Sequence, residues 1–257
     1  ALYGMEEAVL KAYVGENTAP TALRGAPQLI RYADDFVVLH AEAAEVMKAQ
    51  QIIATWLKDI GLELKPSKTR LSHTLMEYQG NRGFTFLGFT IRQFPVGKTH
   101  TGTHHGKPLG FKTIITPSKE GVQRHLQALR RILQKSQAFP QEKLIDQLNP
   151  VIHGWALYYR TVVSTKQFAK CDHLLRGMLW QKMTRKHPDK GAGWVKGKYW
   201  RTMEGRTWTY ATPVGPEQHV LRRHATIPIQ RHIKVKGKAS PFDGNLLYWA
   251  KRVKDHP

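Results

Sequence analysis

The order of apolar and polar positions predicts mixed strand and helix structure in the first part of the chain. Between Gln28 and His40, two short apolar runs flank the polar pair Asp34-Asp35, which predicts a β-hairpin with the acids at its turn. From residue 42 to 60 apolar residues recur at helical spacing, and Gly61 follows, so we expect an amphipathic helix that ends at this glycine. Residues 84–91 predict another strand pair, with Gly88 at a turn or bulge.

Two less regular stretches follow these elements. Leu62, Leu64 and Leu71 are expected in strands around a turn at residues 65–68. Residues 96–110 are rich in Gly, His, Thr and Lys, which favours an exposed loop, so residues 96–117 are assigned to a linker.

The pattern then becomes helical. Ser118 is expected to cap one helix, Asn149 with Pro150 to begin a second, and Ser164 or Thr165 to begin a third that ends before Pro188. The predicted buried stripes of the three helices are Val122, Leu126, Leu129 and Leu133; Val151, Trp155 and Tyr158; and Phe168, Cys171, Leu175, Leu179 and Met183. After Gly191 we expect short strands and loops rich in Trp and Tyr.

These elements predict an α+β fold in four parts. Residues 1–95 form the mixed region, 96–117 the linker, 118–190 the helical region and 191–257 an irregular basic extension.

Charge separates the same regions by function. Residues 1–95 hold ten basic and ten acidic residues, whereas the remainder holds thirty and nine, so the whole formal charge of +21 lies after residue 95. A neutral region joined to a strongly basic one indicates a polyanionic partner. Nucleic acid is favoured over a membrane surface, because no long basic helix has a clean apolar face and no apolar run approaches the ~18 residues of a membrane span.

Few other residues suggest chemistry. Cys171 is the only cysteine, so it forms no internal disulfide, and its place on an apolar stripe favours a core role. His100, His104 and His105 lack a regular ligand spacing, which favours an exposed loop over a metal site.

The Asp34-Asp35 pair is the strongest candidate for chemistry. Adjacent carboxylates repel, and burying both is costly unless a cation compensates them. Mg²⁺ prefers oxygen ligands and is often held by one or two carboxylates plus substrate phosphates, as in two-metal phosphoryl transfer. Taken alone, however, the pair is better explained as a solvated turn, since such pairs are common in turns.

Three blocks in order resemble a known enzyme family. Tyr32-Ala33-Asp34-Asp35 between two strands resembles the catalytic hairpin of reverse transcriptases, and residues 61–69 and 84–89 resemble the next two blocks of that family. Residues 148–159 and 193–200 resemble the maturase domain, domain X, which is the thumb of group II intron-encoded proteins. Residues 240–249 look like the segment that precedes an endonuclease in some members. The chain thus resembles a group II intron-encoded reverse transcriptase/maturase, rather than retroviral or retron enzymes, which lack these extensions. The resemblance implies that residues 1–95 are the C-terminal part of the palm, 118–190 the thumb and maturase domain, and 191–257 the basic DNA-binding extension.

The resemblance implies roles for residues in the first region. Asp34 would be a direct Mg²⁺ ligand and Asp35 a second acid of the site, with Tyr32 and Ala33 near the primer terminus. Lys68 would hold the template-primer or the incoming nucleotide, although it is also explained as an exposed turn lysine. The residues that would support the primer strand are Phe86, Leu87 and Gly88. The family uses a third carboxylate on an earlier strand that has no match here, so we expect DNA synthesis only from the intact protein.

Basic residues mixed with aromatic ones are expected to contact nucleic acid, since cations bind phosphates and rings stack on unpaired bases. The expected RNA-binding residues are Arg124, Arg130, Arg131, Lys135, Arg160, Lys182, Arg185 and Lys186. The expected DNA-binding residues are Lys196, Lys198, Arg201, Lys234, Lys236 and Lys238. Residues 232–238 alternate apolar and basic positions, which predicts a strand with one basic face.

The function implied is that of an RNA-directed DNA polymerase that uses Mg²⁺ and dNTPs. It would bind group II intron RNA to assist splicing and copy that RNA into target DNA, in a ribonucleoprotein in the bacterial cytoplasm or an organelle. One alternative is a splicing-only maturase. Another is a different reverse-transcriptase class, which would not carry the maturase-like region. A DNA-binding protein with a chance acidic turn would leave the ordered blocks unexplained.

Overall fold

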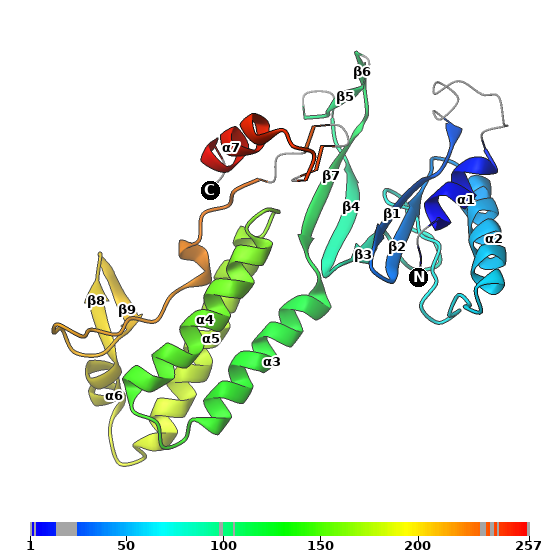
Figure 1. Cartoon of the computed structure of the whole chain (residues 1–257). Coiled ribbons are helices and arrows are strands. Elements are labelled where there is room, and N and C mark those ends of the chain that lie inside the picture. Colours follow the sequence, from blue (N-terminus) through cyan, green and yellow to red (C-terminus); the bar gives the residue numbers. More distant parts are fainter. Residues whose placement is uncertain are drawn as a thin grey trace. The chain divides into compact units, whose positions relative to one another are not determined.

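The computed structural model describes residues 2, 4–13, 25–97, 100–104, 106–231, 235–236, 239–240 and 242–255. The chain forms two compact units, residues 1–137 and 138–257 (Figure 1). Helices and strands mix along the first unit, and helices dominate the second, which confirms the α+β class.

A two-stranded hairpin packs on two helices at the start of the first unit. Strands β1 (Gln28–Tyr32) and β2 (Asp35–Leu39) pair antiparallel. Helices α1 (Met5–Lys11) and α2 (Ala43–Asp59) supply most of the core beneath them (Figure 1). The buried side chains of this core are Met5, Val9, Leu29, Ala49, Ile53 and Leu57. The predicted hairpin and helix are therefore confirmed.

Helix α2 ends as its sequence predicts. Gly61 has a φ of 76°, a conformation that costs little without a Cβ. Its N–H donates to the Lys58 carbonyl at 3.1 Å, and the Leu62 N–H donates to the Leu57 carbonyl at 2.8 Å, which is a Schellman motif. Beyond this motif the predicted strands at Leu62, Leu64 and Leu71 are absent from residues 62–77, all of which are described.

Local hydrogen bonds explain that absence. The Lys65 carbonyl accepts from the backbone N–H groups of Lys68 and Thr69, and also from the Thr69 hydroxyl. Residues 65–69 thus pair their own backbone groups in a tight turn, in place of pairing with a strand.

The second sheet of this unit has the order β3-β4-β7 and is antiparallel. Its strands are β3 (Phe84–Phe86), β4 (Phe89–Pro95) and β7 (Phe111–Pro117). A small hairpin, β5 (Thr103–His104) and β6 (Lys107–Pro108), lies between β4 and β7. The strand pair over 84–91 is confirmed, but the expected linker over 96–117 contains a strand, because Ile114 and Thr116 alternate with exposed positions against β4.

Helix α3 (Lys119–Lys135) follows β7 without a linker. The Ser118 hydroxyl accepts from the Gly121 N–H at 3.0 Å, so the predicted cap is confirmed. Val122, Leu129 and Leu133 are buried as expected, and His125 is buried with them.

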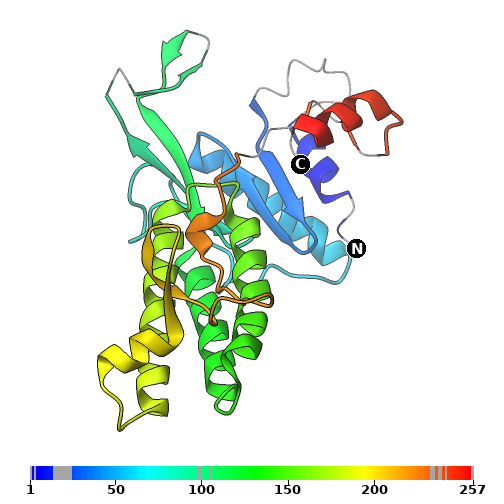
Figure 2. The ribbon, with the colours of Figure 1, turned by 90° about the vertical axis from the view of Figure 1, so that its left-hand side faces the viewer.

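The second unit is built on two long helices, α4 (Gln141–Tyr159) and α5 (Thr165–Lys186). The rings of Trp155 on α4 and Phe168 on α5 lie 5.8 Å apart. Next come α6 (Ala192–Tyr199), strands β8 (Trp200–Met203) and β9 (Arg206–Tyr210), the 3-10 helix η2 (His224–Thr226) and α7 (Leu246–Asp255). Figure 2 shows the segment that contains η2 crossing α4 and α5. No described helix is long and apolar enough to span a membrane.

The predicted start of α4 is wrong. The helix begins at Gln141 and includes Pro150, which cannot donate a backbone hydrogen bond. Asn149 caps nothing: its amide donates to the Val220 carbonyl at 3.0 Å, and its Oδ1 accepts from the Arg222 N–H at 2.7 Å. Asn149 therefore fastens the 220–222 segment to α4.

The buried stripe of α4 is also displaced from the prediction. Its buried residues are Leu144, Ile145, Leu148, Ile152, Ala156 and Tyr159, whereas Tyr158 is 51% exposed. All five residues of the predicted α5 stripe are buried. Residues 192–199 form a helix rather than short strands, and the expected strands begin only at Trp200.

Candidate functional site

The acidic pair lies at the tip of the β1–β2 hairpin. Tyr32 pairs with Asp35, so Ala33 and Asp34 form a two-residue turn, in which Ala33 has a φ of 55°. Tyr32, Ala33, Asp34 and Asp35 are all exposed, Tyr32 by 65%. The turn therefore presents both carboxylates to solvent.

The pairing also decides which face of the hairpin Tyr32 and Asp35 share. Opposite residues of an antiparallel pair lie on the same face, and faces alternate along a strand. Leu29 is buried in the core, and Phe36 and Val38 pack against it. Tyr32 and Asp35 lie an odd number of positions from these core residues along their strands, so their side chains are on the opposite, open face. Ile30, which is 42% exposed, is on that face too.

These carboxylates suit a hard cation. Neither makes an ion pair or hydrogen bond within the described residues, so their oxygens stay available. Mg²⁺ needs only one or two carboxylates when phosphates and water complete its shell. The described part of the chain has no cluster of three or more His, Cys, Asp or Glu residues that could form an all-protein site.

The other residues predicted to bind primer or template lie in the same unit. Lys68 is exposed in the 65–69 turn. Leu87 and Gly88, with φ values of 50° and 79°, form the β3–β4 turn, and Phe86 immediately precedes it. The Gly88 carbonyl accepts from the Ser118 N–H at 2.8 Å, so this turn is tied to the start of α3. Strand β2 lies beside β3; contacts of these residues with a primer remain a prediction.

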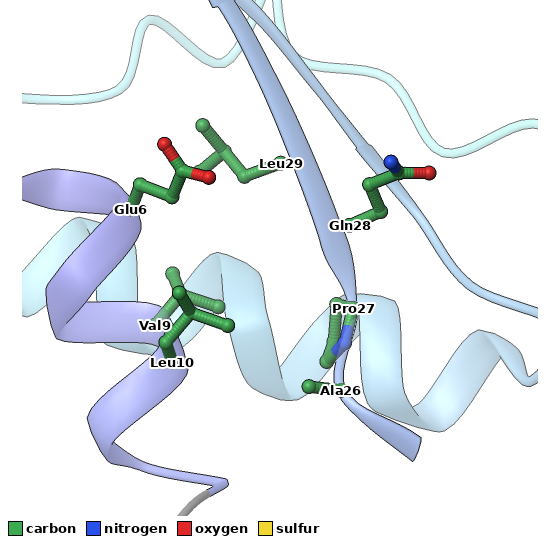
Figure 3. A pocket seen from close by; sticks show the side chains of 7 residues that line it. All are labelled: Glu6, Val9, Leu10, Ala26, Pro27, Gln28 and Leu29. Carbon is green, nitrogen blue, oxygen red and sulfur yellow. The ribbon is translucent and has the colours of Figure 1, made fainter. Parts of the chain in front are cut away.

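A cavity of about 310 Å³ lies between α1 and the start of β1 (Figure 3). Val9 and Leu10 face Leu29 and Pro27 across it, and Glu6 is its acidic residue. The cavity is at the end of β1 away from the Asp34 turn, so it takes no part in the acidic site.

Helix α3 has a cationic outer face. Arg124, Arg130, Arg131 and Lys135 are all exposed, opposite the buried stripe of the helix. Their exposure is as predicted, and RNA binding by them stays a prediction.

In the second unit three of the predicted RNA-binding cations lie near the end of α5, and Arg160 follows α4. Arg185 and Lys186 are exposed, and the Lys186 ammonium donates to the Phe139 carbonyl at 3.3 Å. Partial burial, and then the charge of Lys186, lower the pKa of Lys182. Arg160 is half-buried after the end of α4.

The predicted DNA-binding residues near α6 have partners in the fold. The Lys198 ammonium lies 4.8 Å from the Trp194 ring centre, and the Lys196 ammonium lies 5.0 Å from that of Trp208. The Arg201 guanidinium donates to the Lys198 and Trp200 carbonyls at 3.0 Å, so it caps the end of α6.

The same cations act on a neighbouring histidine. Desolvation and then the charges of Lys198, Lys186 and Lys190 lower the pKa of His187. Its Nε2 forms a 2.7 Å hydrogen bond with the Tyr199 hydroxyl.

The remaining DNA-binding prediction is only partly within the described chain. Lys236 is exposed. Lys234 and Lys238 lie outside the described residues, as does most of the predicted 232–238 strand.

Sequence reasoning missed a groove in the second unit, which we call the arginine groove. It has a volume of about 390 Å³ and lies between α5, the β8–β9 hairpin and residues 221–223. Its aromatic residues are Trp200, Trp208 and Tyr210, and its cations are Arg176, Arg206, Arg222 and Arg223. The sequence signals only one wall of the groove, the β8–β9 hairpin: Glu204-Gly205, with φ values of 49° and 73°, forms a two-residue turn between short runs rich in Trp and Tyr.

Comparison with known families agrees with this geometry. Residues 10–91, which include the acidic hairpin, match the family "Reverse transcriptase (RNA-dependent DNA polymerase)". Residues 122–200, which run from α3 to the start of β8, match "Group II intron, maturase-specific domain". No curated protein matches the chain. Because the two matches occur in this order on one chain, the protein belongs to the group II intron-encoded reverse transcriptase/maturase family.

Proposed function

We propose that the intact protein synthesises DNA on an RNA template at Asp34 and Asp35 and binds intron RNA through its basic region. The observation that carries the proposal is the location of the acids. Asp34 is exposed in the turn, and Asp35 is exposed on the open face, of a hairpin within the reverse-transcriptase match. The charge excess lies in a different region, which contains the maturase match.

The acidic pair would hold Mg²⁺ together with phosphate oxygens of the nucleotide. When bound, the ion would activate the primer hydroxyl and offset charge on the transferred phosphate. Tyr32 shares the face of Asp35, so its exposed ring would lie against the primer end or the incoming dNTP. Lys68 would supply a cation to the same substrates, and the 86–88 turn would support the primer.

Nucleic acid would be divided between the later elements. The exposed cations of α3 and the end of α5 would bind intron RNA, and Lys196, Lys198 and Lys236 would bind target DNA. The protein would act as a ribonucleoprotein with that RNA in the bacterial cytoplasm or an organelle. In splicing, the protein would supply charge and shape that stabilise the folded intron.

Primer extension on an RNA template with Mg²⁺ tests the proposal. The intact protein is expected to synthesise DNA, and Asp34→Ala with Asp35→Ala is expected to abolish synthesis without weakening intron RNA binding. Both residues are exposed, so their replacement changes stability by only about 0.5 kcal/mol or less. Asp59→Ala with Glu77→Ala removes two exposed acids of the same unit that lie outside the three family-like blocks and should leave synthesis intact.

Other results would revise the proposal. If neither the wild type nor the variant synthesises DNA but RNA binding stays tight, the protein is a splicing-only maturase. If the Asp34/Asp35 variant loses RNA binding together with synthesis, the proposed division between the regions is wrong.

A further inference from the structure

We infer that the arginine groove receives unpaired nucleotides of RNA. The inference rests on the proposed RNA-binding function and assigns one of its contact sites. The groove volume of about 390 Å³ is within the roughly 300–1,000 Å³ range of small-ligand pockets, so it has room for a flipped-out base rather than a duplex.

The charge of the groove fits phosphate. Arg206 and Arg222 are exposed, and their guanidinium groups make no ion pair within the described residues. The acid lining the groove, Asp172, is already occupied: it accepts from the His224 N–H at 2.8 Å and from the Ala225 N–H at 3.1 Å. The same carboxylate lies 2.7 Å from His224 Nδ1 and 3.6 Å from Arg223 Nε. Asp172 thus has little capacity to neutralise the other arginines.

An aromatic ring of the groove can stack on a base. Trp208 is 40% exposed, and its ring lies 5.5 Å from that of Trp180 and 5.8 Å from that of Trp200, both edge-on. Trp200 is buried, so these contacts hold the exposed ring in place. The Lys196 ammonium lies 5.0 Å from the centre of this ring, and a stacked base would displace it. Bases stack on such rings whatever their sequence, and an arginine nearby binds the backbone.

The wall that carries Arg222 and Arg223 is fastened at both ends. Asn149 on α4 holds residues 220 and 222, and Asp172 on α5 holds residues 224 and 225. The cations are therefore placed before the nucleic acid arrives, which reduces the entropy cost of binding.

The occupant we assign is single-stranded RNA. A base can enter a concave site beside Trp208 only when it is unpaired, whereas duplex RNA presents mainly its phosphates and 2′-hydroxyls. RNA is favoured over DNA because α5 and Trp200, which form one side of the groove, belong to the maturase-domain match. The RNA surface then extends to residue 223, into the region that the sequence assigned to DNA binding.

Binding by the intact protein tests the inference with three probes of one sequence: single-stranded RNA, the duplex of that RNA, and single-stranded DNA. Trp208→Ala is expected to lower affinity for single-stranded RNA about fivefold or more, as loss of one stacked base does, and to leave duplex affinity unchanged. The matched control is Trp194→Ala, because Trp194 is 42% exposed but does not line the groove. It should change neither affinity.

The arginines are tested with two double variants that each remove two positive charges, one pair inside the groove and one pair outside it. Arg206→Ala with Arg222→Ala should weaken binding of single-stranded RNA more than Lys166→Ala with Lys170→Ala, which removes two exposed cations of α5 outside the groove. An RNA that carries photoreactive iodouridine should crosslink within residues 206–210. Because Arg206 and Arg222 are exposed, this pair reports on binding even if Trp208→Ala disturbs folding.

Each contrary result has a separate meaning. Equal losses in groove and control variants, or crosslinks only elsewhere, would overturn the inference while intron RNA binding persists. Equal groove dependence for the DNA probe would overturn the assignment to RNA. If wild-type protein fails to bind intron RNA at all, the proposed function itself fails.

Discussion

Four described residues other than glycine have positive φ, and all four lie in tight turns. Gln79, Leu87 and Glu204 are each followed by a glycine that also has positive φ, which is the type I′ combination that suits hairpins. Ala33 differs, because no such glycine follows it and Asp34 comes next. A non-glycine residue in this region is strained, and such strain is often found at functional sites. The turn at Gly88 could be predicted from its glycine, whereas the conformation of Ala33 has no such signal.

Cys171 illustrates a residue whose environment the sequence did predict. It lies at helical spacing from Phe168 and Leu175, and all three are buried. Burial, and then the negative charge of Asp172, raise the pKa of the thiol to about 12. The thiolate, which is the reactive form, is therefore scarce at neutral pH.

We expect Cys171 to resist alkylation by iodoacetamide at pH 8 in the folded protein and to react fully in denaturant. Mass spectrometry of the labelled peptide measures both rates, with glutathione as a free-thiol reference. Reaction of the folded protein at the rate of the denatured chain would show that the stripe containing Cys171 is not packed as described.

At the scale of elements, a buried face is in most cases visible as periodicity in the sequence, although the stripe of α4 was predicted wrongly. The α2 and α5 stripes and the β1–β2 hairpin follow this rule. The failures have particular causes. Asn149 and Pro150 imitate a helix start, but the Asn149 amide is bonded to residues 220 and 222, far along the chain. Contacts between residues so far apart in the sequence leave no pattern near Asn149 from which the true helix start could be predicted.

The groove could not be predicted for the same reason. Its walls come from α5, from β8 and β9, and from residues 221–223, and only the fold brings them together. The acidic pair, in contrast, is a local motif whose turn and exposure depend on one hairpin. The turn at Asp34 and Asp35 could therefore be predicted from the sequence, and the arginine groove could not.

Gly83, next to strand β3, is a position where only glycine allows the close approach of strand β4. Its φ is 80°, and a Cβ there would overlap the Ile91 carbonyl oxygen on β4. Gly83→Ala should destabilise the sheet by about 2 kcal/mol or more, because it combines the left-handed backbone cost with a displaced strand. Thermal unfolding, and hydrogen exchange of the β4 amides, measure the effect.

Gly80→Ala separates the two causes. Gly80 has a similar φ of 75°, but its Cβ would meet no atom within 4 Å. Its replacement should cost only about 1–2 kcal/mol, the backbone contribution. Equal losses at the two positions would mean that β4 moves aside without cost.

For the whole molecule, the decisive feature is the separation of charge from the acidic site. Residues 1–95 are neutral, and the charge of +21 lies after them. The acidic pair lies in the neutral region, and the proposed RNA-binding cations lie in the basic one. We therefore expect RNA affinity to depend on the basic region and DNA synthesis to depend on the acidic pair.

Salt concentration tests whether RNA affinity comes from the basic region. Each phosphate that the protein neutralises releases counterions, so the logarithm of RNA affinity should fall linearly with the logarithm of salt concentration, by about 0.7–0.9 per contact. With several contacts, affinity should fall on the order of 10³-fold between 50 and 200 mM salt.

Arg130→Ala with Arg131→Ala removes two exposed cations of α3 and should make this slope shallower by about 1.4–1.8. Asp34→Ala with Asp35→Ala should leave the slope unchanged, because these acids lie outside the basic region. Filter binding across a salt series measures the slope. A flat response would mean that RNA is held by contacts other than phosphate, and that the basic region serves another partner.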